Sequence, residues 1–227
     1  MPAKRKSEFR KVMKKYWTNG TAVLGTCLLF FFIVIAIFAP QIAGVNEMGD
    51  NYQIPRASWS SKPIPPSAEH PFGVIGGRDV FYGVVWGTRT AFRLGLIITG
   101  FAALIGVIVG SISAYFGGWV DEILMRITDI FLSIPFLVAA MVMTTILGKG
   151  LDKVIIALII FGWMSTARLI RGNILQAREE QYVLAAKALG QKDWVIIIKH
   201  ILPNTIFPVV VQMSMRIGSY VITAAGL

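Results

Sequence analysis

Charge and cysteine are scarce in this sequence. Of its 227 residues, 15% are charged and 55% are hydrophobic, and the mean hydropathy is +0.66. Soluble domains rarely have this balance, which is typical of proteins with several membrane spans. The single cysteine, Cys27, can form neither a disulfide within the chain nor a metal cluster. The lipid bilayer is therefore the first partner that we expect.

Motifs for several kinds of chemistry are also missing. No Gly-x-x-x-x-Gly-Lys-Ser/Thr occurs, so the chain lacks this loop for holding ATP phosphates. His-Glu-x-x-His and Gly-x-Ser-x-Gly are absent, which argues against a membrane-embedded enzyme. His70 has no second ligand at a useful spacing, so we predict a loop histidine there. We expect no catalytic residue, no metal site and no cofactor bound by this chain.

Positive charge is concentrated at the N-terminus. The chain has 22 basic and 12 acidic residues, and seven of the basic ones lie in the first 15 positions. These are Lys4, Arg5, Lys6, Arg10, Lys11, Lys14 and Lys15. A basic cluster beside an apolar run predicts a cytoplasmic N-terminus. No nucleic-acid partner is expected, because no DNA- or RNA-binding motif accompanies the charge.

Five apolar segments approach the length that a membrane-spanning helix requires. They cover residues 22–44, 91–115, 127–147, 154–169 and 205–227. The first is too long for an ordinary cleaved signal peptide. We predict an all-α membrane protein, a polytopic helical bundle with five transmembrane helices. The predicted parts are a basic cytoplasmic tail (1–20), a first span (21–44), an extracytoplasmic proline-rich segment (45–90) and a transmembrane core (91–227) with a cytoplasmic loop at about 172–204.

Small residues and a proline mark positions inside the spans. Ala102, Gly106 and Gly110 recur every fourth residue, which predicts a seam where another helix backbone approaches closely. Pro135 should bend the third span, either for ordinary packing or for gating. Near that span's start, Arg126 has two acids within helical reach, and we predict that it pairs with both, Glu122 and Asp129.

The half-polar stretch from Leu184 to Asn204 interrupts the apolar spans. An apolar face precedes Gly190 at helical spacing, formed by Tyr182, Ala185, Ala186 and Leu189. Gly190 then stands where a left-handed helix C-cap is expected. A second face follows it, formed by Trp194, Ile197, Ile198 and Ile201. Asp193 is predicted to cap the start of this second helix, Pro203 to end it, and Asn204 to cap the next span.

Two short amphipathic helices of this kind have two possible locations. They could lie on the lipid surface, where lysines suit anionic headgroups. Alternatively, their apolar faces could dock in a groove of another protein. The spacing alone does not separate these alternatives.

The same stretch resembles a known family motif. The cytoplasmic EAA loop in permease subunits of ABC importers reads Glu-Ala-Ala, three residues, Gly, nine residues, Ile, one residue, Leu-Pro. The matching positions are Ala185, Ala186, Gly190, Leu202 and Pro203. Leu184 replaces the acid, which puts in doubt a salt link that this position makes to the partner in relatives, and His200 replaces the isoleucine.

Three further stretches are similar to the second permease of the dipeptide/oligopeptide/nickel group, the DppC/OppC-like branch. They are "YFGGWVDEILMRITDIFLSIP" (115–135), "ARLIRGNIL" (167–175) and "HPFG" with "GRDV" (70–80), where the usual Thr-Asp after the glycine is absent. The resemblance covers roughly residues 16–227. Relatives continue through a sixth span, so we expect a C-terminal part beyond this sequence.

The resemblance implies an ABC importer permease of type I. A second permease subunit would complete the path, an extracytoplasmic binding protein would deliver substrate, and two cytoplasmic ATPase subunits would bind ATP and Mg. Di- or oligopeptides are the implied substrates, with nickel or oligosaccharides as alternatives. An autonomous channel remains a further alternative. The implied location is a bacterial or archaeal cytoplasmic membrane, and the implied ATPase-coupling residues are Tyr182, Ala185, Ala186, Leu189, Gly190, Trp194, Leu202 and Pro203.

Arg216 is an unusual charge within the last apolar segment. A cation there is costly in lipid, about 2.5–3.5 kcal/mol on insertion scales, so it should face a cavity or a partner. Gln212 and Ser219 lie on the same helical face. These three residues are candidates for the translocation path, and pairing of Arg216 with carbonyls or an acid of a neighbouring subunit is the alternative.

Overall fold

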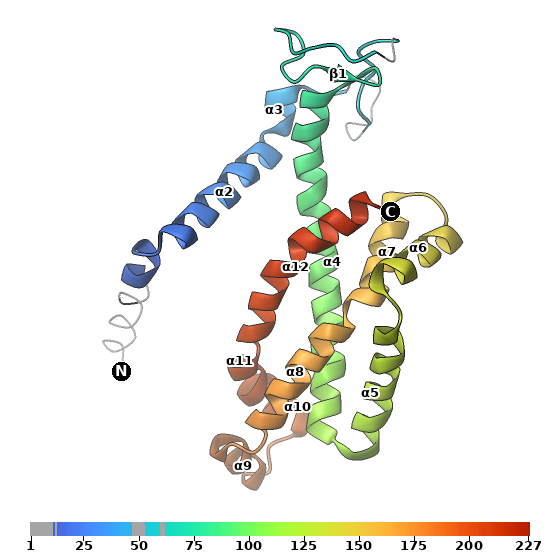
Figure 1. Ribbon diagram of the computed structural model, residues 1–227. Coiled ribbons are helices and arrows are strands. Elements are labelled where there is room, and N and C mark those ends of the chain that lie inside the picture. The colour runs from blue at the N-terminus through green and yellow to red at the C-terminus, as the bar shows by residue number, and fades with distance from the viewer. Residues whose placement is uncertain (1–10, 12, 47–52, 60–61) are drawn as a thin grey trace. The chain divides into compact units, whose positions relative to one another are not determined.

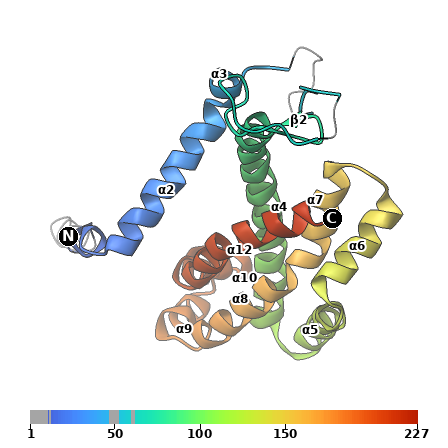
Figure 2. The same cartoon turned by 45° about the horizontal axis from the view of Figure 1, so that its top comes forward.

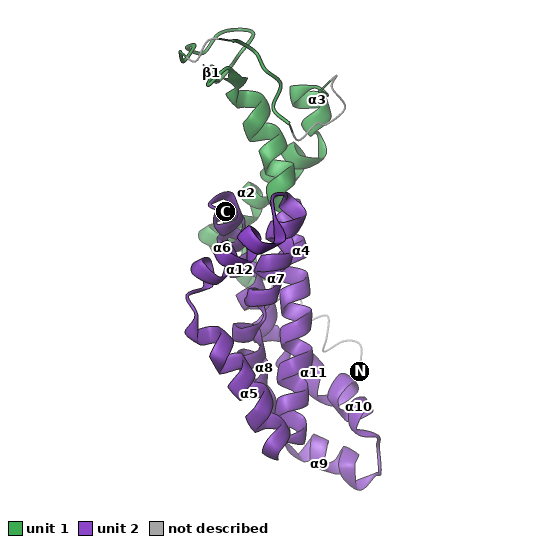
Figure 3. Ribbon diagram, turned by 90° about the vertical axis from the view of Figure 1, so that its right-hand side faces the viewer, with its two compact units in different colours: residues 1–92 green, residues 93–227 purple. Residues whose placement is uncertain are grey.

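The computed structural model describes residue 11 and residues 13–46, 53–59 and 62–227. Figure 1 shows a chain made almost entirely of helices. It divides into two compact units, residues 1–92 and 93–227, which Figure 3 colours separately. Lys4, Arg5, Lys6 and Arg10 lie outside the described residues, so the predicted location of the basic tail stays a prediction.

The first unit begins with an apolar helix that buries very little of itself. Helix α2 (Gly20–Ile37) starts at Asn19, whose side chain accepts a hydrogen bond from the Ala22 amide. In this fully described helix Ala36 is the one buried residue, because apolar side chains cover every face. The short helix α3 (Ala39–Ala43) follows.

A two-residue turn organises the chain before the next helix. Strands β1 (Val74–Ile75) and β2 (Arg78–Asp79) pair antiparallel around Gly76 and Gly77. Both glycines have positive φ, 59° and 75°, which a turn of this length in a hairpin favours. Residues 53–59 and 62–73 are otherwise extended chain, bends and turns, as the prolines predict.

Helix α4 (Val80–Phe116) begins earlier than the sequence predicts. The predicted span starts at Ala91, and the stretch just before it was assigned to the proline-rich segment. The helix itself begins at Val80, because Asp79 caps it there: its carboxylate accepts a hydrogen bond from the Tyr82 amide at 3.0 Å. The residues after Asp79 contain no proline before Pro135, so nothing interrupts the helix.

Side chains of α3 and α4 form the core of the first unit. Ala39, Tyr82, Val85 and Trp86 are buried together. The Trp86 indole also donates a hydrogen bond to the Gly44 carbonyl at 3.1 Å, which fixes the end of α3 against α4.

The second unit is a bundle of broken helices, which Figure 2 shows with the top of Figure 1 tilted towards the viewer. After α4 come α5 (Gly118–Ser133), α6 (Phe136–Leu147), α7 (Leu151–Gly162), α8 (Met164–Ala177), α9 (Gln181–Ala188), α10 (Asp193–Val195), the π-helix η1 (Ile196–Ile201), α11 (Leu202–Thr205) and α12 (Phe207–Ala225).

Membrane spans can be assigned by length and hydropathy within the described residues. Three stretches qualify without a sharp bend: Gly20–Ile37, Val80–Phe116 and Leu151–Ala177. Two bent pairs also qualify, α5 with α6 at 87° and the helix from Asp193 to Thr205 with α12 at 61°. The fold class is confirmed, and five spans result if each bent pair counts as one.

The bend at Pro135 is a complete break of the helix. Helix α5 ends at Ser133 and α6 begins at Phe136. Ile134 has ψ of 127°, outside the helical region, because the ring of a following proline excludes that region. The proline thus ends one helix before the next begins, where only a bend was predicted, and the two halves of this span run nearly at right angles.

The seam of small residues is confirmed as a close contact between α4 and α8. A Cβ placed on Gly110 would lie 2.3 Å from the Ala167 carbonyl oxygen, and one on Gly106 would lie 2.7 Å from the Trp163 carbonyl oxygen. Ala102 is buried and approaches Gly162. The backbones of the two helices therefore approach so closely that no side chain larger than a hydrogen atom fits at Gly106 or Gly110.

Candidate functional site

The half-polar stretch folds into a helical hairpin that connects α8 to α12. We call residues 181–205 the connector hairpin: its first limb is α9, Gly190 lies at its turn, and its second limb runs through α10, η1 and α11. Figure 1 shows it at the end of the second unit where α4 and α8 also end.

One face of the connector hairpin is buried against the bundle. Val183 and Ala186 from the first limb and Ile196 and Ile201 from the second lie in one apolar cluster. The other buried members come from the ends of α4, α8 and α12: Ala114, Tyr115, Ile170, Ile174, Ala177 and Val209. The hairpin is thus anchored by hydrophobic packing to three helices of the membrane core.

The turn at Gly190 has the predicted conformation. Gly190 has φ of 70°, in the left-handed region. Its amide donates to the Lys187 carbonyl at 2.9 Å, and the Gln191 amide donates to the Ala186 carbonyl at 3.2 Å. This pair of bonds is a Schellman motif, which closes the end of α9. The turn therefore depends on a residue that tolerates positive φ.

The second limb differs from the prediction at its start. Asp193 is the first residue of α10, and Lys192 occupies the cap position. The Asp193 carboxylate does not cap the helix; it accepts a hydrogen bond from the Tyr115 hydroxyl at 2.6 Å. The prediction that Asp193 is an N-cap is therefore wrong, because a tertiary partner takes its side chain.

The second limb also ends later than predicted. Pro203 lies in the first turn of α11, where a missing amide hydrogen costs little, and the helix continues to Thr205. Asn204 donates to the His200 carbonyl at 2.7 Å and does not cap α12, which has Ile206 at its cap position. The predictions that Pro203 stops the limb and that Asn204 caps the span are wrong.

The π-helix changes which isoleucines are buried. Its bonds run from residue i to i+5, and the Leu202 amide donates to the Ile197 carbonyl. Ile196 and Ile201, five apart, are therefore both fully buried, whereas Ile198 is exposed and Ile197 is half-buried. The predicted face of Trp194, Ile197, Ile198 and Ile201 does not exist as one surface.

The outward face of the connector hairpin is apolar and uncovered. The predicted face of α9 divides: Ala186 points into the core, while Tyr182, Ala185 and Leu189 are exposed. Leu189 is 79% exposed and Trp194 is 58% exposed. The further exposed apolar residues are Leu184 and Ile198. We call the six exposed residues the outer face: Tyr182, Leu184, Ala185, Leu189, Trp194 and Ile198.

Polar contacts tie the hairpin and its entrance to α4. The Lys187 ammonium lies 5.1 Å from the centre of the Tyr115 ring, a cation–π contact. Before α9, the Arg178 guanidinium donates to the Ala114 carbonyl at 2.9 Å. After the turn, His200 of the second limb and Gln191 are hydrogen-bonded at 2.8 Å. The first two of these contacts join the hairpin and its entrance to the end of α4.

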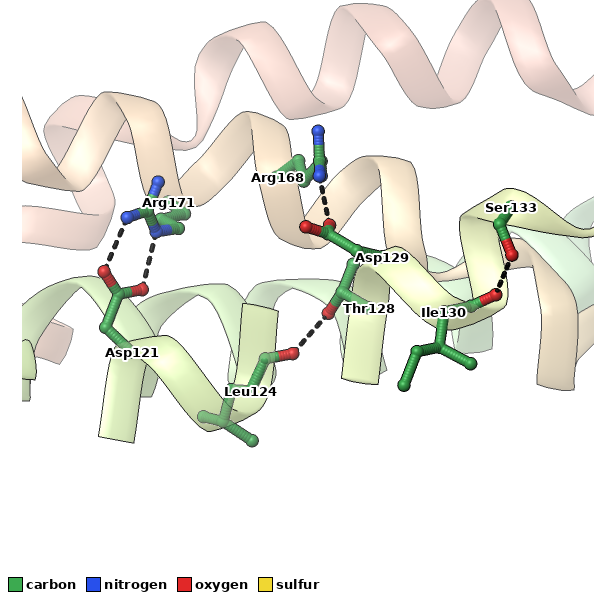
Figure 4. Close-up of polar contacts among 8 residues, drawn as sticks. All are labelled: Asp121, Leu124, Thr128, Asp129, Ile130, Ser133, Arg168 and Arg171. Carbon is green, nitrogen blue, oxygen red and sulfur yellow. Dashed lines mark hydrogen bonds and ion pairs between the residues drawn. The ribbon is translucent and has the colours of Figure 1, made fainter. Parts of the chain in front are cut away.

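Two ion pairs join α5 to α8 on the approach to the hairpin, as Figure 4 shows. Arg171 binds Asp121 through two hydrogen bonds, of 2.5 and 2.6 Å. Asp129 pairs with Arg168, so the predicted Asp129–Arg126 pair is wrong. Arg126 does pair with Glu122, at 2.8 Å, as predicted.

The candidate path residues in α12 contact other parts of the bundle. Gln212 accepts a hydrogen bond from the Thr166 hydroxyl of α8 at 3.3 Å. Arg216 is half-buried, and the Tyr220 hydroxyl one turn away donates a hydrogen bond to the Gly162 carbonyl at 3.0 Å. Ser219 is exposed. A role of these residues in the path stays a prediction.

Comparison with known proteins decides the family. Residues 88–227 match the family described as "Binding-protein-dependent transport system inner membrane component", and residues 7–63 match the "N-terminal TM domain of oligopeptide transport permease C". This chain belongs to the binding-protein-dependent transport permeases. The permease is a transport subunit of an ABC importer, works with other subunits of that system, and is a multi-pass protein of the cytoplasmic membrane.

Curated relatives are similar along nearly the whole permease. The dipeptide transport system permease protein DppC of Alkalihalophilus pseudofirmus is 36% identical over 222 residues, which are 97% of this chain and 71% of that protein. The oligopeptide transport system permease protein OppC of Bacillus subtilis has the same identity over 97% of this chain and 70% of its own. The glutathione transport system permease protein GsiD of Escherichia coli O6:H1 is 33% identical over 100% of this chain and 75% of its own length.

Sequence reasoning missed two features of the permease's site. Tyr115 and Asp193 are far apart in the sequence, and no local pattern pairs them. Val183 is not part of the apolar face predicted for α9. It is buried because the side of α9 that carries it packs against the bundle. A single sequence does not indicate that a tyrosine and an acid on separate helices will lie side by side in the fold.

Proposed function

We propose that this permease lines the transmembrane path of a peptide importer together with a second permease subunit, and that the outer face of the connector hairpin docks on a cytoplasmic ATPase subunit. Two ATPase subunits would bind ATP and Mg, and an extracytoplasmic binding protein would deliver the substrate. No cofactor is assigned to this chain itself.

The observation that carries this proposal is the two-sided character of the connector hairpin. Its inner face is packed against three helices of the bundle, whereas its outer face presents uncovered apolar side chains. An apolar helix face of this kind fits a groove on a partner protein. Because the inner face is rigidly held, a displacement of the partner would move α4, α8 and α12 with it.

Cross-linking tests the docking surface. In a Cys27→Ser background, Leu189→Cys and Ala186→Cys place a thiol on the two faces of the same helix, since Leu189 is exposed and Ala186 is buried. We expect a thiol cross-linker to join Leu189→Cys to the ATPase subunit and to leave Ala186→Cys unjoined. An assembled complex in which Leu189→Cys gives no ATPase adduct would contradict the proposal.

The substrate class rests on the named relatives, which are permeases for dipeptides, oligopeptides and glutathione. We propose short peptides for this permease. Uptake of labelled dipeptide and tetrapeptide into vesicles holding the whole transporter should exceed uptake of nickel or an oligosaccharide. Uptake of nickel or oligosaccharide alone would reassign the substrate.

A role of Arg216 in the path is tested by replacing it with methionine. If Gln212, Arg216 and Ser219 face the substrate, Arg216→Met should change peptide selectivity or the uptake rate. Unchanged values for both would contradict a role of Arg216 in the path.

A further inference from the structure

Tyr115 occupies a position from which it contacts both limbs of the connector hairpin. Its hydroxyl donates to Asp193 at the start of the second limb, at 2.6 Å. Its ring lies 5.1 Å from the ammonium of Lys187 near the end of the first limb. Gly190 lies between these two contacts, so a single side chain of α4 spans the hairpin turn.

The two partners, Asp193 and Lys187, are exposed, whereas Tyr115 itself is buried. The residue is 8% exposed and belongs to the apolar cluster that includes Val183 and Ala186. A hydrogen bond from a buried hydroxyl to a carboxylate is charge-assisted and poorly replaced by water. Apolar packing alone allows a hairpin to slide and rotate, whereas these two directed contacts define its angle to α4.

We propose that Tyr115 is the positioning residue that sets the orientation of the connector hairpin and transmits its movement to α4. The inference rests on the proposed docking function of the outer face. Packing of Val183, Ala186, Ile196 and Ile201 holds the hairpin on the bundle, and Tyr115 fixes its angle by binding both limbs. Without this link, the ATPase would bind a hairpin whose orientation relative to the spans is not fixed.

Spin labelling of the permease in the assembled transporter measures the orientation directly. A nitroxide on Leu189→Cys, in a Cys27→Ser background, reports the mobility of the hairpin tip. We expect Tyr115→Phe to raise the mobile fraction roughly fivefold, since the net contribution of an ordinary, part-buried hydrogen bond is on this scale. Cross-linking of Leu189→Cys to the ATPase should fall in parallel, while the amount of permease in the membrane stays unchanged.

Variants of Asp193 separate positioning from general destabilisation. Asp193→Ala should match Tyr115→Phe, and the double variant should be no worse than either single one, because all three lose the same bond. Asp193→Asn keeps an oxygen acceptor and should restore the immobile spectrum. Asp152→Ala is a matched control, because it removes a carboxylate that pairs with Lys153 outside the hairpin.

The outcomes distinguish this inference from the proposed function. If Tyr115→Phe and Asp193→Ala give wild-type spectra, or if their effects add, Tyr115 does not position the hairpin. If both variants loosen the hairpin but the otherwise wild-type Leu189→Cys permease gives no ATPase adduct, the positioning contact stands and the docking proposal fails.

Discussion

At the scale of single residues, a few side chains at particular positions determine the geometry of the connector hairpin. Gly190 provides a left-handed turn, Tyr115 binds both limbs, and Leu184 stands where the resembled EAA motif would place an acid. With no acid at position 184, we expect docking to depend on the apolar outer face. Asp79 has a comparable role in the first unit, where it caps α4 and binds His70 at 2.7 Å.

Replacing Gly190 tests the turn. A Cβ at this position would meet no described atom within 4 Å, so the cost of Gly190→Val comes from the positive φ and is about 1–2 kcal/mol. We expect ATPase copurification or peptide uptake to fail while membrane insertion survives. Gly190→Asn is the control, because asparagine tolerates this conformation. Normal uptake by Gly190→Val would refute the requirement for a fixed turn.

Asp79 gives the first unit a pH-dependent contact. Partial burial by itself raises the pKa of Asp79, but hydrogen bonds from His70 and from the amides of Tyr82 and Phe81 outweigh it, so the pKa lies below its usual value. A lowered carboxyl pKa stabilises the fold above the unfolded value of about 3.9, and this stabilisation is lost as the pH falls through the folded pKa.

The change Asp79→Asn isolates this contribution, because asparagine still caps α4. We expect the melting temperature of the permease in detergent to fall by roughly 1–3 °C at pH 7, because the partly exposed carboxylate loses hydrogen bonds that together contribute about 0.5–1 kcal/mol. The difference should shrink as the pH falls below about 3.9 and should vanish below the lowered pKa of folded Asp79, where the carboxyl has lost its charge. An equal difference at pH 7 and pH 3 would show that charge is not involved.

At the scale of elements, close packing and breaks shape the bundle. The contact of α4 with α8 and the Gly190 turn are predictable from the sequence, because each depends on residues at fixed spacing along one segment. The π-helix is not, because isoleucine occupies positions 196, 197 and 198 and gives no clue to which face is buried. The Asp129–Arg168 pair joins different helices, so local spacing favoured the wrong partner, Arg126.

The α4–α8 contact can be tested with two glycines of one helix. Gly110→Ala places a Cβ against the Ala167 carbonyl and should destabilise the permease by about 1–3 kcal/mol through forced separation of the helices. Gly100→Ala is the control, because a Cβ there would meet no described atom within 4 Å. Thermal unfolding in detergent should show a loss for Gly110→Ala only. Equal melting temperatures would mean that the helices separate without cost.

At the scale of the whole molecule, function depends on which side of the membrane each segment occupies. The basic N-terminus predicts a cytoplasmic start, which places the β1–β2 segment outside and the connector hairpin inside. The division of the chain at residues 45 and 91 is not tested by the structure and stays a prediction, apart from the earlier start of α4.

Thiol labelling in intact cells tests this orientation. In a Cys27→Ser background, an impermeant maleimide should label Ala68→Cys and should leave Thr18→Cys and Leu189→Cys unlabelled until the membrane is opened. Labelling of Leu189→Cys in intact cells would place the connector hairpin outside and would contradict docking on a cytoplasmic ATPase.

The break between Ser133 and Phe136 affects where water is expected within the membrane. Where a helix stops within a span, backbone amides and carbonyls lose their partners in the helix, and hydrocarbon offers none in return. Since α5 and α6 diverge by 87° there, the ends of both need water or a neighbouring protein backbone. Hydration measured along this span should therefore peak at Pro135, deep in an otherwise apolar sequence.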